Sequence, residues 1–243
     1  HREFKAWSNA IIASSAVPPN LPRPPEAIEA TLALRTFLAD EIERRRHTPG
    51  PDLISALIAS QEAEALTPGE LLGFLILLLM AGNETTTNLI GNGVLALMRH
   101  QEQLQRLRKA PDLINSAIEE MLRFDSPVQG TVRLARHKAN VRGTDIEPGT
   151  LVIVLLAAAN RDPSRFARPD AFDIARDPNE HLAFGEGIHF CLGAPLARLE
   201  GSIAIRSIVQ RFPRLALADQ AARLTYKGSL FLRGLASLPI TIG

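Results

Sequence analysis

The side chain best suited to chemistry is the only cysteine, Cys191, which lies in the glycine-rich segment 184–193. Glycines at 185, 187 and 193 can adopt positive φ without steric cost and let the backbone approach a flat partner closely. A helix is expected to begin just after the cysteine, and the N–H groups and positive dipole at a helix start stabilise a thiolate. Such a thiolate is suited to ligate a haem iron, whereas one cysteine cannot form a four-cysteine zinc site.

Other interpretations of this segment remain open when it is taken alone. A lone cysteine is more often an inert buried side chain. Gly185 and Gly187 could form only a turn, and a dinucleotide-binding loop would need a glycine where Phe190 stands. His189 and Cys191 could be a hydrolase pair, although no orienting group is evident nearby.

A second candidate is the segment 81–86, Ala-Gly-Asn-Glu-Thr-Thr, inside a strongly helical pattern. A buried polar group there costs about 1–3 kcal/mol if it has no partner. Gly82 weakens the helix, and the Thr85 hydroxyl can compete for the carbonyl of Ala81, so the helix could open locally and admit O2 and water. The alternative is a satisfied kink in the core.

Two further sets of charged residues are candidates. Glu120 and Arg123 are three residues apart and therefore share one helix face, where they could be a surface ion pair worth about 0–1 kcal/mol. Arg133 lies in a strand-like run, and its guanidinium suits a carboxylate bidentately. The alternative for Arg133 is a solvated strand arginine.

The elements that must position these residues are mainly helical. Helical patterns are predicted at about 4–16, 26–46, 52–64, 67–99, 101–109, 111–123 and 194–211. The long helix begins with a capping box at Thr67 and Glu70, and its apolar run 71–81 predicts a course through the core. Short strands are predicted at 131–134, 141 and 151–156, and loops at 161–190. The expected fold is mainly α with small β-sheets (α+β), as a single domain over 1–243.

The composition excludes several classes of partner. Lys and Arg number 27 against 26 Asp and Glu, so no overall field favours nucleic acid or an anionic membrane. Aromatic residues make up 5%, which argues against base-stacking platforms. The longest apolar run, 71–81, is shorter than the roughly 18–20 residues of a membrane span. A single cysteine suits the reducing cytoplasm, where the protein is expected.

The motifs together resemble those of the cytochrome P-450 family. Segment 184–193 is similar to its haem-binding pattern, Phe-Gly-x-Gly-x-His-x-Cys-x-Gly, at every fixed position. Segment 81–86 resembles its oxygen-activation motif, and Glu120 with Arg123 resembles its Glu-x-x-Arg. Three such patterns in family order make chance agreement very unlikely.

The resemblance implies a role for each candidate. Cys191 is the implied iron ligand of haem b (iron protoporphyrin IX), and Glu84 and Thr85 supply protons for the reduction of dioxygen. Glu120, Arg123 and Arg176 form a structural triad that ties a helix to the loop before the cysteine. The other implied haem-binding residues are His189 and Arg133 (propionates), Phe184, Gly185, Gly187, Gly193, Ala81 and Gly82. The implied substrate contacts are Leu79, Val128, Gln129 and Phe231.

The activity implied by the resemblance is that of a soluble bacterial monooxygenase. It would insert one oxygen atom from O2 into a small organic substrate, with electrons from a ferredoxin or flavoprotein. Since the family's N-terminal sheet and early helices have no counterpart here, the fold is expected to be an incomplete, C-terminal part of the family fold. The alternative is a truncated non-catalytic fragment or interaction module that binds haem poorly or not at all. Peroxide-driven oxidation fits less well, because Glu84 and Thr85 suit the O2 route.

Overall fold

The computed structural model describes residues 2–14, 17, 21–62, 66–219 and 223–242. Contacts divide the chain into two compact units, which we call the N-terminal unit (His1–Glu84 with Gly228–Leu230) and the C-terminal unit (Thr85–Lys227 with Phe231–Gly243). The expectation of one domain over 1–243 therefore stays a prediction. Within the described residues, no helix is sufficiently long and apolar to cross a lipid bilayer.

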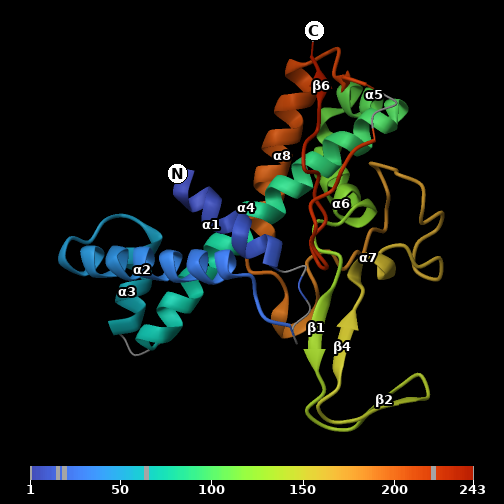
Figure 1. The fold of residues 1–243 in the computed structure, drawn as a ribbon. Helices are drawn as coiled ribbons and strands as arrows, with labels where there is room; N and C mark the ends of the chain where they lie inside the picture. Colours follow the sequence, from blue (N-terminus) through green and yellow to red (C-terminus); the bar gives the residue numbers. More distant parts are fainter. Residues whose placement is uncertain (1, 15–16, 18–20, 63–65, 220–222, 243) are drawn as a thin grey trace. The chain divides into compact units, whose positions relative to one another are not determined.

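The N-terminal unit is built from helices (Figure 1). It contains α1 (Arg2–Ala13), α2 (Pro25–His47), α3 (Leu53–Glu62) and the first part of α4 (Pro68–Arg99). Apolar residues recur along α2 at helical spacing, so one stripe of the helix is buried. The buried core of this unit comprises Leu34, Leu38, Ile42, Ile58, Leu71 and Leu75.

Helix α4 begins with the predicted capping box. The Glu70 N–H donates to Thr67 Oγ1 at 3.2 Å, and the Thr67 N–H donates to Glu70 Oε2 at 2.8 Å. The helix is continuous from Pro68 to Arg99, so the local opening suggested by the sequence at 81–86 is not present.

The predicted burial of the run 71–81 was wrong. Leu71 and Leu75 are buried, but Leu77 on another side of the helix is 60% exposed. Side chains of α1, α2 and α3 pack around the Leu71 and Leu75 side of this part of α4 and leave Leu77 uncovered. The continuously buried part is instead 92–98, in the C-terminal unit.

The C-terminal unit packs the second part of α4 with α5 (Gln101–Lys109), η2 (Pro111–Leu113), α6 (Ile114–Phe124) and α8 (Ala194–Arg211). Small residues allow these helices to approach closely. A Cβ on Gly93 would lie 2.6 Å from Met121 Sδ, and one on Gly201 would lie 3.1 Å from Leu89 Cδ2. These two glycines are therefore packing positions between helices.

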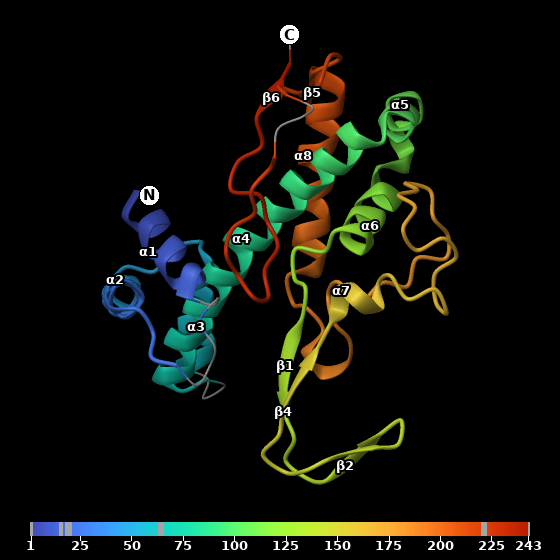
Figure 2. The same cartoon turned by 45° about the vertical axis from the view of Figure 1, so that its right-hand side comes forward.

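Among the described residues, the C-terminal unit also contains three two-stranded antiparallel sheets. Figure 2 shows β1 beside β4. Strand β1 (Thr131–Leu134) pairs with β4 (Leu151–Val154), so that Thr131 lies opposite Val154. The other pairs are β2 (Ala139–Val141) with β3 (Thr144–Ile146), and β5 (Ala216–Leu217) with β6 (Ile240–Thr241). Helix α7 (Leu156–Ala159) begins where the predicted strand 151–156 was expected to end. The fold is thus mainly helical with small sheets, as predicted.

Candidate functional site

The segment 184–193, which we call the Cys191 loop, folds back on itself directly before α8. The Cys191 N–H donates to the Phe184 carbonyl at 3.0 Å, and the Phe190 N–H donates to the Gly187 carbonyl at 2.9 Å. The second bond closes the short helix η3 (Gly187–His189). These bonds fix the backbone on both sides of the sulfur.

Two of the three loop glycines have the backbone conformation expected from the sequence. Gly185 and Gly187 have φ of 73° and 75°, which other residues adopt only with strain. Gly193 has φ of −82°, so the prediction of a positive φ at this position was wrong. A Cβ on Gly187 would meet no atom within 4 Å, and one on Gly193 would lie 3.9 Å from Cys191 Sγ. The lack of a Cβ at Gly193 therefore leaves the space beside Cys191 Sγ open.

The side chains around the thiol are apolar and exposed. Cys191 is exposed, so the alternative of an inert buried cysteine is wrong. Ile188 is 97% exposed, Phe190 51% and Leu192 74%. A free thiol surrounded by exposed apolar side chains on a glycine-lined loop fits a flat, largely apolar group with a soft metal at its centre, such as haem.

The two residues predicted to bind propionates are also exposed. His189 lies in η3 of the Cys191 loop. Arg133 lies on β1, where its Nη1 donates to Thr131 Oγ1 at 3.1 Å and to the Val132 carbonyl at 2.9 Å. Both side chains belong to the C-terminal unit, and the propionate role of each stays a prediction.

The structure brings the three predicted triad residues together. Arg123 Nε lies 2.7 Å from Glu120 Oε2, and Arg176 Nε lies 3.1 Å from the same oxygen. The Glu120 and Arg123 side chains are fully buried, so the alternative of a surface ion pair is wrong. The Asp173 N–H donates to Glu120 Oε1 at 2.9 Å, which attaches the loop-rich segment, residues 161–190, to α6.

Asn160 extends this cluster toward the Cys191 loop, and sequence reasoning missed it. Asn160 is completely buried, its carbonyl accepts from Arg123 Nη1 at 2.8 Å, and its Nδ2 donates to Ser126 Oγ at 3.0 Å. The Leu182 N–H donates to Asn160 Oδ1 at 2.7 Å, two residues before Phe184. An asparagine directly after a short helix is a weak sequence signal, and its partners lie far along the chain.

The predicted oxygen-activation residues lie along α4. Ala81, Gly82 and Glu84 belong to the N-terminal unit and Thr85 to the C-terminal unit. Glu84 is 6% exposed, Thr85 is half-buried, and Ala81 and Gly82 are exposed. Their predicted association with the Cys191 loop stays a prediction.

Three of the four predicted substrate contacts lie together in the C-terminal unit. Val128 forms an isolated β-bridge with Leu232, and the Gln129 N–H donates to the Phe231 carbonyl at 2.8 Å. The fourth, Leu79, is a half-buried residue of α4 in the N-terminal unit.

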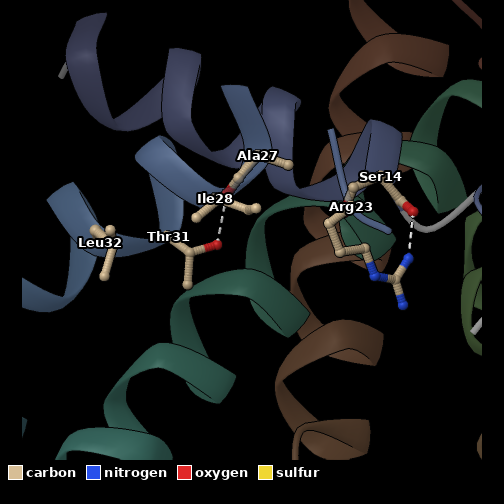
Figure 3. Close-up of a pocket in the computed structure, with 6 residues that line it drawn as sticks. All are labelled: Ser14, Arg23, Ala27, Ile28, Thr31 and Leu32. Atoms are coloured by element: carbon tan, nitrogen blue, oxygen red, sulfur yellow. Dashed lines mark hydrogen bonds between the residues drawn. The ribbon is translucent and has the colours of Figure 1, made fainter. Parts of the chain in front are cut away.

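The N-terminal unit carries a separate surface pocket of about 420 Å³ (Figure 3). Its polar side chains already have partners within the unit. Arg23 Nη1 donates to the Ser14 carbonyl at 2.5 Å and to the Val17 carbonyl at 3.1 Å, and Thr31 Oγ1 donates to the Ala27 carbonyl at 2.7 Å. Apolar Ile28 and Leu32 complete the lining.

Comparison with known proteins gives consistent results. The family model described as Cytochrome P450 matches residues 26–239. Cytochrome P450 107B1 of Saccharopolyspora erythraea is 43% identical over 99% of this chain and 58% of its own length. The biotin biosynthesis cytochrome P450 of Bacillus subtilis is 49% identical over 84% of this chain and 51% of its own length. Vitamin D(3) 25-hydroxylase of Pseudonocardia autotrophica is 44% identical over 99% of this chain and 59% of its own length.

Solved structures of the same family superpose closely on the chain. P450BioI, crystallised with an acyl carrier protein ligated to hexadec-9Z-enoic acid, superposes with a TM-score of 0.92 at 42% identity, over 100% of this chain and 62% of that one. CYP109E1 from Bacillus megaterium in complex with testosterone gives a TM-score of 0.92 at 40% identity, over 100% of this chain and 64% of that chain. The chain thus spans between half and two thirds of the length of these relatives.

Proposed function

Because the chain belongs to the cytochrome P450 family, we propose that it carries the haem-binding part of a monooxygenase that inserts one oxygen atom from O2 into a small organic substrate. The observation that carries the proposal is the Cys191 loop. It presents an exposed thiol among exposed apolar side chains, on a backbone shaped by positive-φ glycines. The triad supports it, because Glu120 and Arg123 on α6 bind Arg176 and so anchor the segment that precedes this loop.

The cofactor proposed is haem b, which supplies the redox chemistry of oxygen activation when it is bound. Cys191 would hold its iron as a thiolate, the ligand type that favours O–O cleavage. His189 and Arg133 would bind the propionates, since both side chains are exposed donors. Gly185 and Gly187 would let the macrocycle approach the loop backbone.

Glu84 and Thr85 are proposed to hold and pass the protons that the reduction of O2 consumes. Glu84 is nearly buried in α4, and the adjacent Thr85 is half-buried with a hydroxyl able to donate and accept. Ala81 and Gly82, one turn earlier, are small and leave space beside the helix. A carboxyl followed by a hydroxyl on one helix is a suitable proton path.

The proposed substrate contacts are Leu79, Val128, Gln129 and Phe231, which are mainly apolar. The names of the relatives refer to biotin biosynthesis and to vitamin D3, so they support a small organic substrate without selecting one. Electrons are proposed to come from a ferredoxin or flavoprotein. A free cysteine suits the reducing cytoplasm as the proposed location.

The test is an absorption spectrum of the haem-loaded, reduced protein under carbon monoxide. We expect a strongly red-shifted Soret band for the wild type and for the control Gln210→Ala, an exposed position on α8. Cys191→Ser should lose this band while the free energy of unfolding of the haem-free chain changes by less than about 0.5 kcal/mol, because Cys191 is exposed. A folded wild type that takes up no haem, or a Cys191→Ser variant that keeps the band, would overturn the proposal.

A further inference from the structure

A second charged cluster, distinct from the triad, lies against the Cys191 loop. Glu119 of α6 accepts hydrogen bonds from Arg198 of α8, with Nε at 2.7 Å from Oε1 and Nη2 at 2.8 Å from Oε2. His181 Nε2 lies 3.0 Å from Glu119 Oε2. The Arg198 guanidinium lies over the ring of Phe184, with Cζ 4.6 Å from the ring centroid. Helices α6 and α8 and the loop residue His181 therefore meet at one carboxylate, and Phe184 packs on the arginine that binds it.

The hydrogen bonds of His181 indicate which of its ring nitrogens donates to Glu119. His181 Nδ1 accepts from the Ala183 N–H at 3.2 Å, so Nε2 carries the proton and donates to Glu119. The His181 side chain is only 3% exposed, whereas Glu119 and Arg198 are 28% and 39% exposed. Burial opposes ionisation of Glu119, but the hydrogen bonds from Arg198 and His181 prevail and lower its pKa to about 2. Glu119 is therefore a fixed negative charge at neutral pH.

Phe184 connects this cluster to the sulfur. Its carbonyl accepts the Cys191 N–H at 3.0 Å, and its ring lies 6.3 Å from that of Phe190, the residue before the cysteine. Arg198 lies on α8, the helix that begins directly after the loop. The pKa of Arg198 is raised, chiefly by the hydrogen bond to Glu119 and in smaller part by the charges of Glu119 and Cys191. Arg198 is thus linked to the cysteine through one residue, Phe184, whose ring it covers and whose carbonyl accepts the Cys191 N–H.

We propose that Arg198 and Glu119 are positioning residues for the Cys191 thiolate: Arg198 holds Phe184 and with it the loop, and Glu119 offsets the positive charge that Arg198 presents to the sulfur. This inference rests on the proposed function, since it concerns the thiolate as a haem ligand. Groups that contact a ligand's neighbours rather than the metal commonly tune the metal's reduction potential.

The two charges should act with opposite sign on the reduction potential of a bound haem. Reduction of the iron adds one negative charge to the site, so a nearby positive charge favours the reduced state. Glu119→Gln removes a negative charge and should raise the potential. Arg198→Gln removes a positive charge and should lower it. A purely structural role would loosen the loop in both variants and shift both potentials in one direction.

The experiment measures the potential of the haem-loaded protein by spectroelectrochemical titration. We expect a rise for Glu119→Gln, a fall for Arg198→Gln and a smaller change for Arg198→Lys, which keeps the charge but loses the planar fork. The matched control is Arg161→Gln. Arg161 also pairs with a carboxylate, Asp170, at 2.8 Å and lies over an aromatic ring, that of Phe124, at 4.4 Å. This control should leave the potential unchanged.

A haem-free measurement separates failure of this inference from failure of the proposed function. Arg198→Gln should speed amide hydrogen exchange at Cys191 by about two- to fivefold, through loss of the cation–π contact that holds Phe184, and Arg161→Gln should not. A wild-type protein that lacks the red-shifted Soret band under carbon monoxide would contradict the proposed function, but the exchange measurement would still test the role of Arg198 in holding the loop. Shifts of equal sign in the two charge variants, or unchanged exchange at Cys191, would overturn the positioning role.

Discussion

Glu119 and Glu120 are consecutive residues of α6, yet their carboxylates lie in different surroundings and hold different loops. Glu120 is fully buried with Arg123 and Arg176, and it fixes the loop-rich segment at Asp173. Glu119 is 28% exposed and binds Arg198, which lies over Phe184 of the Cys191 loop. Successive helix residues point about 100° apart, so one helix serves both loops from two of its faces.

The difference in burial implies different roles for the two clusters, one in protein stability and the other in the properties of the Cys191 thiolate. A buried cluster is weakly screened, and removing one partner leaves an uncompensated charge in the core. A half-exposed pair is screened by solvent and contributes little to stability, but its charges still act on nearby groups. The Glu120 cluster should therefore determine whether the loop-rich segment folds, and the Glu119 cluster how the Cys191 thiolate behaves.

The largest expected effect comes from removing the buried arginine. Arg123→Met should lower the free energy of unfolding by about 3–5 kcal/mol, because it leaves Glu120 buried without its closest partner. Arg198→Met, the same change in the half-exposed cluster, should cost about 0–1 kcal/mol. Urea unfolding followed by circular dichroism measures both. Equal losses in the two variants would remove the distinction between the clusters.

A smaller effect is expected at Asn160, which links the buried cluster to the Cys191 loop. Asn160→Ala leaves the Leu182 N–H and Ser126 Oγ without their Asn160 partner in a buried region and should cost about 1–3 kcal/mol. The control, Asn140→Ala on an exposed hairpin, should stay within about 0.5 kcal/mol. Urea unfolding gives the stability, and hydrogen exchange at Leu182 should accelerate only in the first variant. Unchanged exchange there would show that Asn160 does not hold the loop.

The parts predicted well from the sequence carry their signal locally. The capping box at Thr67 and Glu70 needs only four residues, and the helix 194–211 is marked by its own periodicity. The spacing of Glu120 and Arg123 placed them on one face of a helix. Each of these features is determined by residues within one or two helical turns.

The parts that sequence reasoning missed depend on the path of an irregular segment. His181, Asn160 and Arg198 meet their partners across 22 to 79 residues of chain, through loops that have no periodicity. The exposure of Leu77 has a similar cause, because an apolar helix surface does not reveal which of its sides has a neighbour. Both require knowledge of the tertiary contacts.

The smallest effect at neutral pH is expected for Glu119→Gln, about 0–1 kcal/mol, and acid pH should make it visible. The pKa of Glu119 is lowered from 4.5 to about 2, because hydrogen bonds from Arg198 and His181 outweigh the opposing effect of burial. As the pH falls below 4.5 the unfolded carboxyl binds a proton while the folded one stays ionised. The stabilisation is therefore complete above that pH and lost progressively as the pH approaches 2. Urea unfolding across this range should give a shallower decline for Glu119→Gln than for the wild type, whereas parallel declines would mean that the Arg198 pairing does not act on the folded carboxyl.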